Sequence, residues 1–228
     1  MSAVRRRHPP AGHALRALHA QVGRSRCGLQ LTLVFRGAGE ALPTLRSERL
    51  CLRQWRAEDH APFAALNADA RVTRFLGSAL DRAQSDALAH RIQDEMRRRG
   101  FGLWAAERTD LPDRPFIGFI GLAVPRFEAA FTPCVEVGYR LASEHWGLGL
   151  ATEGARRVLE FAFQELQLEA VVSFTTRTNA ASRRVMEKLG LRYQPDEDFE
   201  HPSLAPDHPL RPHVLYRIVA AEWFAARG

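Results

Sequence analysis

The stretch Glu136-Val-Gly-Tyr-Arg-Leu-Ala-Ser-Glu-His-Trp-Gly-Leu-Gly-Leu-Ala-Thr-Glu-Gly154 decides the fold of this 228-residue chain. Its beginning belongs to a strand predicted at residues 135–141, and its end opens an amphipathic helix predicted at residues 152–166. Between the two, Gly147 and Gly149 allow positive φ and a close approach of the backbone to a ligand. Because the free N–H groups and the dipole of the helix start face this turn, the stretch predicts a site for an anion, usually a phosphate.

Regular elements continue on both sides of this stretch. Further strands are expected at residues 49–55, 102–107, 116–124, 170–175 and 213–219, and further helices are expected from Glu58 onward and at residues 81–99 and 180–189. This order places an antiparallel-looking run of three strands before a β-α-β-α-β segment. We therefore expect an α/β (α+β) protein with a mixed sheet and helices on both faces.

Two nucleotide-binding fingerprints do not fit the glycine turn. A Walker loop ends in Gly-Lys-Ser/Thr, and the turn contains no lysine. A dinucleotide fingerprint needs Gly or Ala where Thr152 stands, and an acid closing the next strand. That strand ends instead in Thr175-Thr-Arg-Thr-Asn179. Both classes of nucleotide site are therefore disfavoured.

Two segments carry a more specific signal: Trp146-Gly-Leu-Gly-Leu-Ala151 and Asn179-Ala-Ala-Ser-Arg-Arg-Val-Met-Glu-Lys-Leu-Gly190. Together they resemble the GNAT superfamily of N-acetyltransferases and, within it, the RimJ/RimL-like branch, over about residues 45–224. Trp146 departs from the Arg or Gln of the general pattern but matches that branch. The resemblance implies a GNAT-like, mostly antiparallel central sheet with a V-shaped splay between two parallel strands and helices on both faces.

The same resemblance implies the chemistry. It points to acetyl-CoA as the acyl donor, with no metal, and to transfer of the acetyl group to a primary amine by direct attack in a ternary complex. The acceptor would be a protein N-terminal α-amine or an amine-bearing small molecule. A non-catalytic acyl-CoA-binding module remains an alternative, because Met186 stands where many relatives carry a proton-donating tyrosine.

The residues expected to bind acetyl-CoA fall into three groups. Backbone N–H groups of the turn would cradle the pyrophosphate: Trp146, Gly147, Leu148, Gly149, Leu150, Ala151 and Thr152. Backbone groups of the preceding strand would bind the pantetheine arm as a pseudo-strand: Val137, Tyr139, Arg140 and Leu141. Asn179 would contact the same arm, although capping of the following helix is an equally physical role for Asn179 or Ser182.

Glu136 is the candidate catalytic base, since it begins the strand that would hold the thioester and the related branch tends to carry a glutamate there. The alternative is a structural acid paired with an arginine. Alternation places Glu136, Gly138 and Arg140 on one face of the strand. Ser182 is the candidate acid near the sulfur, although it could merely orient the cofactor, with solvent protonating the thiolate.

The basic character of the chain is confined to its beginning. Residues 1–40 hold seven arginines and one acid, which gives this segment a net charge of +6. Residues 41–228 hold the other 25 basic and 25 acidic side chains, so their net charge is zero. We therefore predict a basic N-terminal extension at residues 1–43, disordered or loosely attached, and an acetyltransferase domain at residues 44–228. A targeting peptide and an N-terminus extended by a misplaced start codon are the alternatives for the extension. Three scattered cysteines, and no apolar run near the 20 residues of a membrane span, favour a cytoplasmic protein. Nucleic acid is not an expected partner, and a homodimer is an open expectation.

Overall fold

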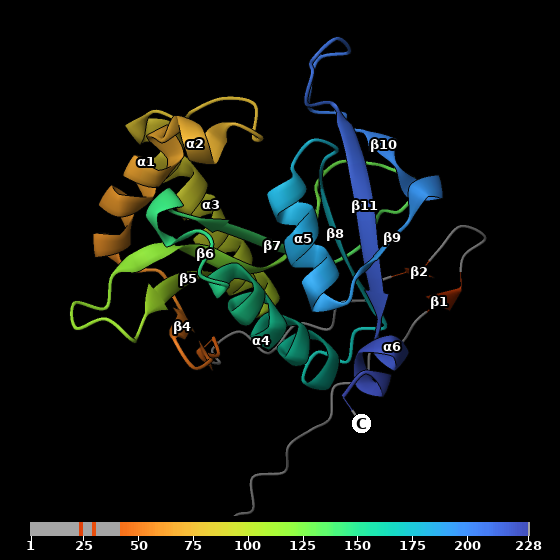
Figure 1. The fold of residues 1–228 in the computed structure, drawn as a ribbon, viewed down its shortest axis with the longest axis horizontal. Helices are drawn as coiled ribbons and strands as arrows, with labels where there is room; N and C mark the ends of the chain where they lie inside the picture. Colours follow the sequence, from red (N-terminus) through yellow and green to blue (C-terminus); the bar gives the residue numbers. More distant parts are fainter. Residues whose placement is uncertain (1–22, 25–28, 31–41, 228) are drawn as a thin grey trace, which may run out of the picture.

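The computed structural model describes residues 23–24, 29–30 and 42–227. The predicted basic extension lies almost wholly outside these residues, so its boundary at residue 43 stays a prediction. Within that region, β1 (Gly23–Arg24) and β2 (Leu29–Gln30) form an antiparallel pair. From Leu42 onward the chain builds one large sheet with helices on both faces (Figure 1).

The sheet has nine strands and is mostly antiparallel. Its order is β10-β11-β8-β7-β6-β5-β4-β3, with β9 paired to β11. The strands are β3 (Leu45–Arg46), β4 (Leu50–Arg53), β5 (Leu103–Arg108), β6 (Phe116–Ala123), β7 (Glu136–Leu141), β8 (Ala170–Thr176), β9 (Arg192–Tyr193), β10 (Phe199–Glu200) and β11 (Pro212–Val219). Only β7 and β8, at the centre, run parallel.

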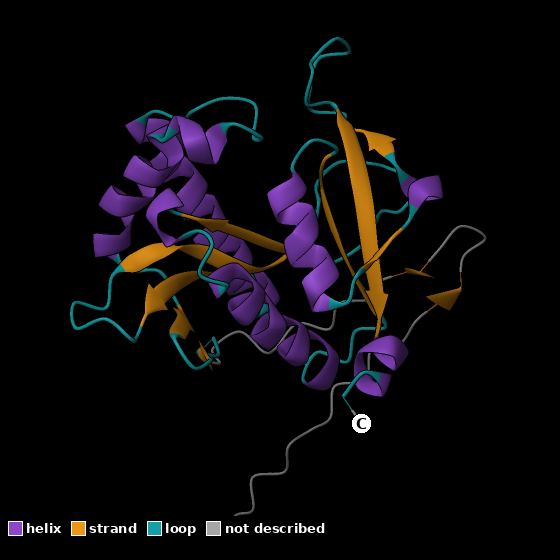
Figure 2. Ribbon diagram, viewed as in Figure 1, coloured by secondary structure: helices purple, strands orange, loops and turns teal. Residues whose placement is uncertain are grey.

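Helices cover the two faces of the sheet (Figure 2). They are α1 (His60–Ala68), α2 (Ala70–Thr73), α3 (Arg82–Arg99), α4 (Leu150–Gln164), α5 (Ala180–Leu189) and α6 (Ala220–Ala225), with the short 3-10 turns η1 (Ala57–Asp59), η2 (Ser143–His145) and η3 (Pro195–Glu197). On β6, Phe119 packs edge-on against Phe63 of α1, while its neighbour Ile120 lies against Gly154 of α4. Since adjacent strand residues point to opposite faces, α1 and α4 lie on opposite sides of the sheet.

Helix ends follow local chemistry. Asp81 and Gln84 form a capping box at the start of α3, and Gly100, with φ of 74°, ends that helix. The helix predicted at residues 180–189 has those ends, because Asn179 caps it and Gly190 closes it with φ of 89°. The helix predicted at residues 152–166 instead runs from Leu150 to Gln164, since Gly149 already provides its N-cap.

The parallel pair at the centre diverges, as expected from the resemblance. β6 pairs with β7 over six consecutive positions, whereas β7 and β8 share the single bridge Glu136↔Val172. The two strands therefore separate beyond Glu136 and leave a V-shaped gap, which confirms the predicted fold class. Among the described residues, no helix has both the length and the apolar composition needed to cross a bilayer.

Candidate active site

The gap between β7 and β8 begins at Glu136 and widens along β7. Near its closed end, the Val172 N–H donates to the Val135 carbonyl at 2.9 Å and the Ser173 hydroxyl donates to the Val137 carbonyl at 2.9 Å. Near its open end, the Leu141 carbonyl accepts the Trp146 indole N–H at 2.8 Å. Strand alternation turns the N–H and C=O of Tyr139, between these positions, into the same gap, where β8 no longer pairs. An extended amide chain could add there as a short strand.

The glycine turn leads from the open end of the gap to α4. Gly147 and Gly149 have φ of 75° and 81°, as the sequence predicted for a left-handed turn, and a Cβ on Gly147 would meet no atom within 4 Å. The N–H groups from Gly147 through Leu148, Gly149, Leu150 and Ala151 to Thr152 donate to no other described residue, while the Trp146 N–H donates to Ser143 at 3.2 Å. The open anion cradle thus begins at Gly147, at the positive end of the 15-residue helix α4.

A salt bridge that sequence reasoning missed holds this turn in place. Glu153, in the first turn of α4, accepts the Arg49 N–H at 2.8 Å, the Arg49 Nε–H at 2.8 Å and the Ser47 hydroxyl at 2.7 Å. The same guanidinium donates from Nη1 to the Leu148 carbonyl at 3.2 Å. Burial alone would raise the pKa of Glu153, but the hydrogen bonds from Arg49 and Ser47 outweigh it and lower that pKa. Glu153 therefore stays ionised and ties the turn to the edge of β4.

Glu136 lies at the closed end of the gap with an unpaired carboxylate. It makes no hydrogen bond or ion pair with any described residue, so the alternative of a structural acid paired with arginine is not what the structure has. Its side chain is half-buried, and desolvation raises its pKa to about 8. A carboxylate with a pKa near neutrality and no partner can accept a proton from a substrate.

Tyr139 and Ser182 meet on the other face of β7. The Tyr139 hydroxyl donates to the Ser182 carbonyl at 3.0 Å and lies 3.1 Å from the Ser182 Oγ. Burial raises the pKa of Tyr139, so its hydroxyl stays protonated. Met186, one turn further along α5, is buried in the core and offers no proton.

Asn179 has a capping role in the structure. Its Oδ1 accepts the Ser182 N–H at 3.2 Å and its Nδ2 donates to the Thr175 hydroxyl at 3.0 Å. The alternative considered for this residue, capping of α5, is therefore observed. One N–H of the amide is left for a ligand, so a contact to the cofactor stays a proposal.

Arg140 faces away from the gap. Its carbonyl lies against Gly118 of β6, and its Nη1 donates to Asn67 Oδ1 of α1 at 2.7 Å. The guanidinium also lies over the Phe119 ring, 5.3 Å from its centroid. Burial lowers the pKa of Arg140 to about 10. Unlike Val137, Tyr139 and Leu141, Arg140 therefore presents both its side chain and its carbonyl to the opposite side from the expected pantetheine arm.

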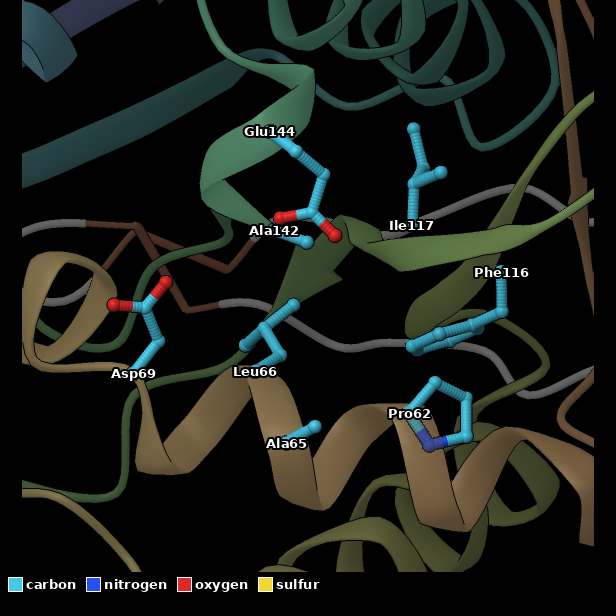
Figure 3. Close-up of a pocket in the computed structure, with 8 residues that line it drawn as sticks. All are labelled: Pro62, Ala65, Leu66, Asp69, Phe116, Ile117, Ala142 and Glu144. Atoms are coloured by element: carbon cyan, nitrogen blue, oxygen red, sulfur yellow. The ribbon is translucent and has the colours of Figure 1, made fainter.

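A pocket lies just beyond Leu141, the last residue of β7, whereas Glu136 is the first residue of that strand (Figure 3). It is lined by Pro62, Ala65, Leu66, Asp69, Phe116, Ile117, Ala142 and Glu144. Both Asp69 oxygens are already hydrogen-bonded, to Arg71 and Ser143. None of the predicted site residues lines this pocket. Among the described residues, no group of three or more His, Cys, Asp or Glu side chains is placed to hold a metal ion.

Comparisons with known proteins agree with this geometry. Residues 49–192 match the family described as acetyltransferase (GNAT) domain. The FsC-acetyl coenzyme A-N(2)-transacetylase of Aspergillus fumigatus is 35% identical over 128 residues, which are 54% of this chain and 52% of that protein. An acetyltransferase structure from Agrobacterium tumefaciens superposes with a TM-score of 0.63 at 26% identity, covering 80% of this chain and 98% of that one.

A third comparison concerns the fold alone. The structure of Mycobacterium smegmatis RimJ in complex with CoA-disulfide superposes with a TM-score of 0.62 at 20% identity, covering 85% of this chain and 97% of that chain. The diverging β7–β8 pair, the open N–H groups before α4 and the family match over more than half of the chain lead to one conclusion. The chain belongs to the GNAT family of acetyltransferases.

Proposed function

We propose that this chain is an acetyl-CoA-dependent N-acetyltransferase in which Glu136 is the base that accepts a proton from a primary amine. The observation that carries this proposal is the unpaired Glu136 carboxylate, with a pKa of about 8, at the point where β7 and β8 part. An amine that reaches this point lies next to the gap in which a thioester would be held.

The gap and the turn fit an acyl-CoA. The N–H groups of residues 147–152 would bind the pyrophosphate, because they are open and lie at a helix start. The backbone groups of Val137, Tyr139 and Leu141 would bind the pantetheine amides. The Val137 and Leu141 carbonyls already accept hydrogen bonds from Ser173 and Trp146, so Tyr139 is the principal contact on this strand. We place Arg140 on the acceptor side instead.

Acetyl-CoA supplies the thioester whose carbonyl carbon is attacked. Residues of the chain accept a proton from the amine and return a proton to the thiolate. The amine forms the new C–N bond and gives up a proton to the Glu136 carboxylate, while the C–S bond breaks. Ser182 would lie near the sulfur and return a proton to the thiolate, either through its hydroxyl, which would regain a proton from solvent, or by ordering solvent. The proton accepted by Glu136 would then pass to solvent and restore the carboxylate. Tyr139 would position Ser182, since its hydroxyl holds both the Oγ and the carbonyl of that residue.

The finer assignments rest on the sequence motifs. Trp146 before the glycines supports a place in the RimJ/RimL-like branch, and with it a protein N-terminus as one acceptor to test. A small-molecule amine is the other, since the Aspergillus fumigatus relative is named as an N(2)-transacetylase. A cytoplasmic location and a homodimer are further expectations, to be tested by fractionation and by light scattering.

Thiol release from acetyl-CoA, measured with peptides, polyamines and aminoglycosides as acceptors, tests the proposed function. Release that depends on an acceptor, together with mass spectrometry of the acetylated product, supports it. Tight binding of coenzyme A without release for any acceptor would instead establish the alternative, a binding module that has lost turnover.

A further inference from the structure

One face of β7 carries a carboxyl group and a guanidinium, neither of which has a charged partner among the described residues. Glu136 and Arg140 lie four residues apart on the same face, so their Cα atoms are separated by about 13 Å. Glu136 makes no hydrogen bond or ion pair with a described residue, and Arg140 makes one hydrogen bond, to the neutral Asn67. A central strand normally has both faces covered by protein. Glu136, Gly138 and Arg140 are nevertheless each only half-buried; on the opposite face Val137 and Leu141 are buried and Tyr139 is half-buried.

The guanidinium of Arg140 is held in place, with donors left over. Asn67 is fully buried and donates its Nδ2 to the Ser85 hydroxyl at 2.9 Å, which fixes its Oδ1 toward Arg140. Asp69 makes no ion pair with Arg140; its oxygens accept hydrogen bonds from Arg71 and Ser143. The remaining Arg140 nitrogens have no hydrogen-bond partner among the described residues, and they are not completely enclosed by protein.

Gly138 lies between Glu136 and Arg140 on the same face and has no side chain of its own. A Cβ added to Gly138 would have Leu103 Cδ2 at 3.8 Å and Glu136 Oε1 at 4.0 Å as its near neighbours. Within 4 Å of this position, Leu103 and Glu136 are therefore the only described residues that approach, and neither is in close contact. A planar guanidinium with free N–H groups is suited to bind a carboxylate through two parallel hydrogen bonds.

Resting on the proposed function, we infer that Arg140 binds a carboxylate on the acceptor while Glu136 receives the proton of its amine. The substrate class is a primary amine that carries a carboxylate at about the length of a peptide of two or three residues, which extends roughly 3.3 Å per residue. Such an acceptor would lie over Gly138, which has no side chain to obstruct it. Arg140 is then a specificity-determining residue, and an acceptor that lacks the anion reaches the same base less efficiently.

Matched acceptors test this inference. Trialanine with a free C-terminal carboxylate is compared with trialanine amide, and an amide tripeptide with aspartate at the third position distinguishes a side-chain carboxylate from a terminal one. For the wild-type protein we expect kcat/KM about 10 to 100 times higher for a carboxylate-bearing acceptor, the range for hydrogen bonds to charged groups. In Arg140→Met this preference should fall to near one, with the KM for acetyl-CoA unchanged.

Arg91→Met, which removes an exposed arginine from α3, is the matched control and should keep the wild-type preference. If Arg140→Met does not melt cooperatively, Arg140→Lys is used in its place. We expect the kcat/KM preference of Arg140→Lys for the carboxylate-bearing acceptor to be at least threefold lower than that of the wild-type protein, because an ammonium group cannot form two parallel hydrogen bonds in a fixed plane. A wild-type preference near one, or a preference that survives both substitutions, would overturn the inference while amine acetylation itself stands. Absence of thiol release with every acceptor would overturn both the inference and the proposed function.

Discussion

Replacement of Glu136 by glutamine tests the assigned base. With a pKa of about 8, roughly one carboxyl in eleven is ionised at pH 7 and ten in eleven at pH 9. The kcat/KM of the wild-type protein should therefore rise about tenfold between these pH values. Glu136→Gln should lose that rise and lower kcat by a factor on the order of 10² to 10⁴, the usual contribution of a general base.

The assay follows thiol release with an aromatic amine, which is neutral throughout this pH range, so that titration of the acceptor does not contribute. Glu128→Gln changes an exposed glutamate in the loop before β7 and serves as the control. A Glu136→Gln variant whose rate and pH profile match those of the wild-type protein would refute the assignment of the base.

The same substitution has an effect on stability whose sign is fixed. The pKa of Glu136 is raised on folding, so its contribution is most favourable below pH 4.5, where the carboxyl is protonated in both states, and falls as the pH rises to about 8. The loss is at most about 5 kcal/mol, and partial solvent access reduces it. Glu136→Gln should therefore gain Tm relative to the wild-type protein between pH 5 and pH 8. A constant difference across this range would contradict the desolvation of Glu136.

Three further substitutions test the glycine turn and a buried ion pair of the core. Glu153→Gln weakens the salt bridge to Arg49, so the KM for acetyl-CoA should rise about tenfold with kcat nearly unchanged. An unchanged KM would show that this salt bridge does not position the glycine turn. Gly149→Ala places a side chain at φ of 81°, and should lower the free energy of unfolding by about 1 to 2 kcal/mol and weaken coenzyme A binding measured by calorimetry; wild-type values for both would be inconsistent with a required left-handed turn. Buried Arg53 of β4 donates to both carboxylate oxygens of buried Asp59, at 2.7 and 2.8 Å, and also pairs with Glu107. Asp59→Asn removes one charge from this group and should cost about 1.5 to 3 kcal/mol in urea unfolding, against almost nothing for the exposed Glu58→Gln; a loss below 1 kcal/mol would argue against the buried pair.

Much of the fold could be predicted because it depends on local signals. Residues 180–189 form the predicted helix since a capping asparagine precedes them and a glycine follows. The start of α4 was misplaced by two residues, because the left-handed conformation of Gly149 depends on how the turn is held and not on its composition. The short elements β9, β10, α2 and α6 were not predicted, since two to six residues give too little periodicity.

The candidate site was only partly readable from the sequence. Alternation correctly separated Glu136 and Arg140 from Tyr139, because strand geometry fixes that relation. The salt bridge between Arg49 and Glu153 joins residues 104 positions apart, and it depends on how α4 packs beside β4. Likewise, the contact of Arg140 with Asn67 follows from the packing of α1 on β6 and β7, which no local pattern encodes.

A crystal structure of the chain with coenzyme A is the sharpest test of the proposed cofactor site. We expect pyrophosphate oxygens to accept hydrogen bonds from the N–H groups of residues 147–152. We also expect the pantetheine arm to lie between β7 and β8 beside Tyr139, with the sulfur closer to Ser182 than to the pocket at Ala142. Coenzyme A bound outside the β7–β8 gap, or a pyrophosphate away from the start of α4, would show that the site is assigned wrongly.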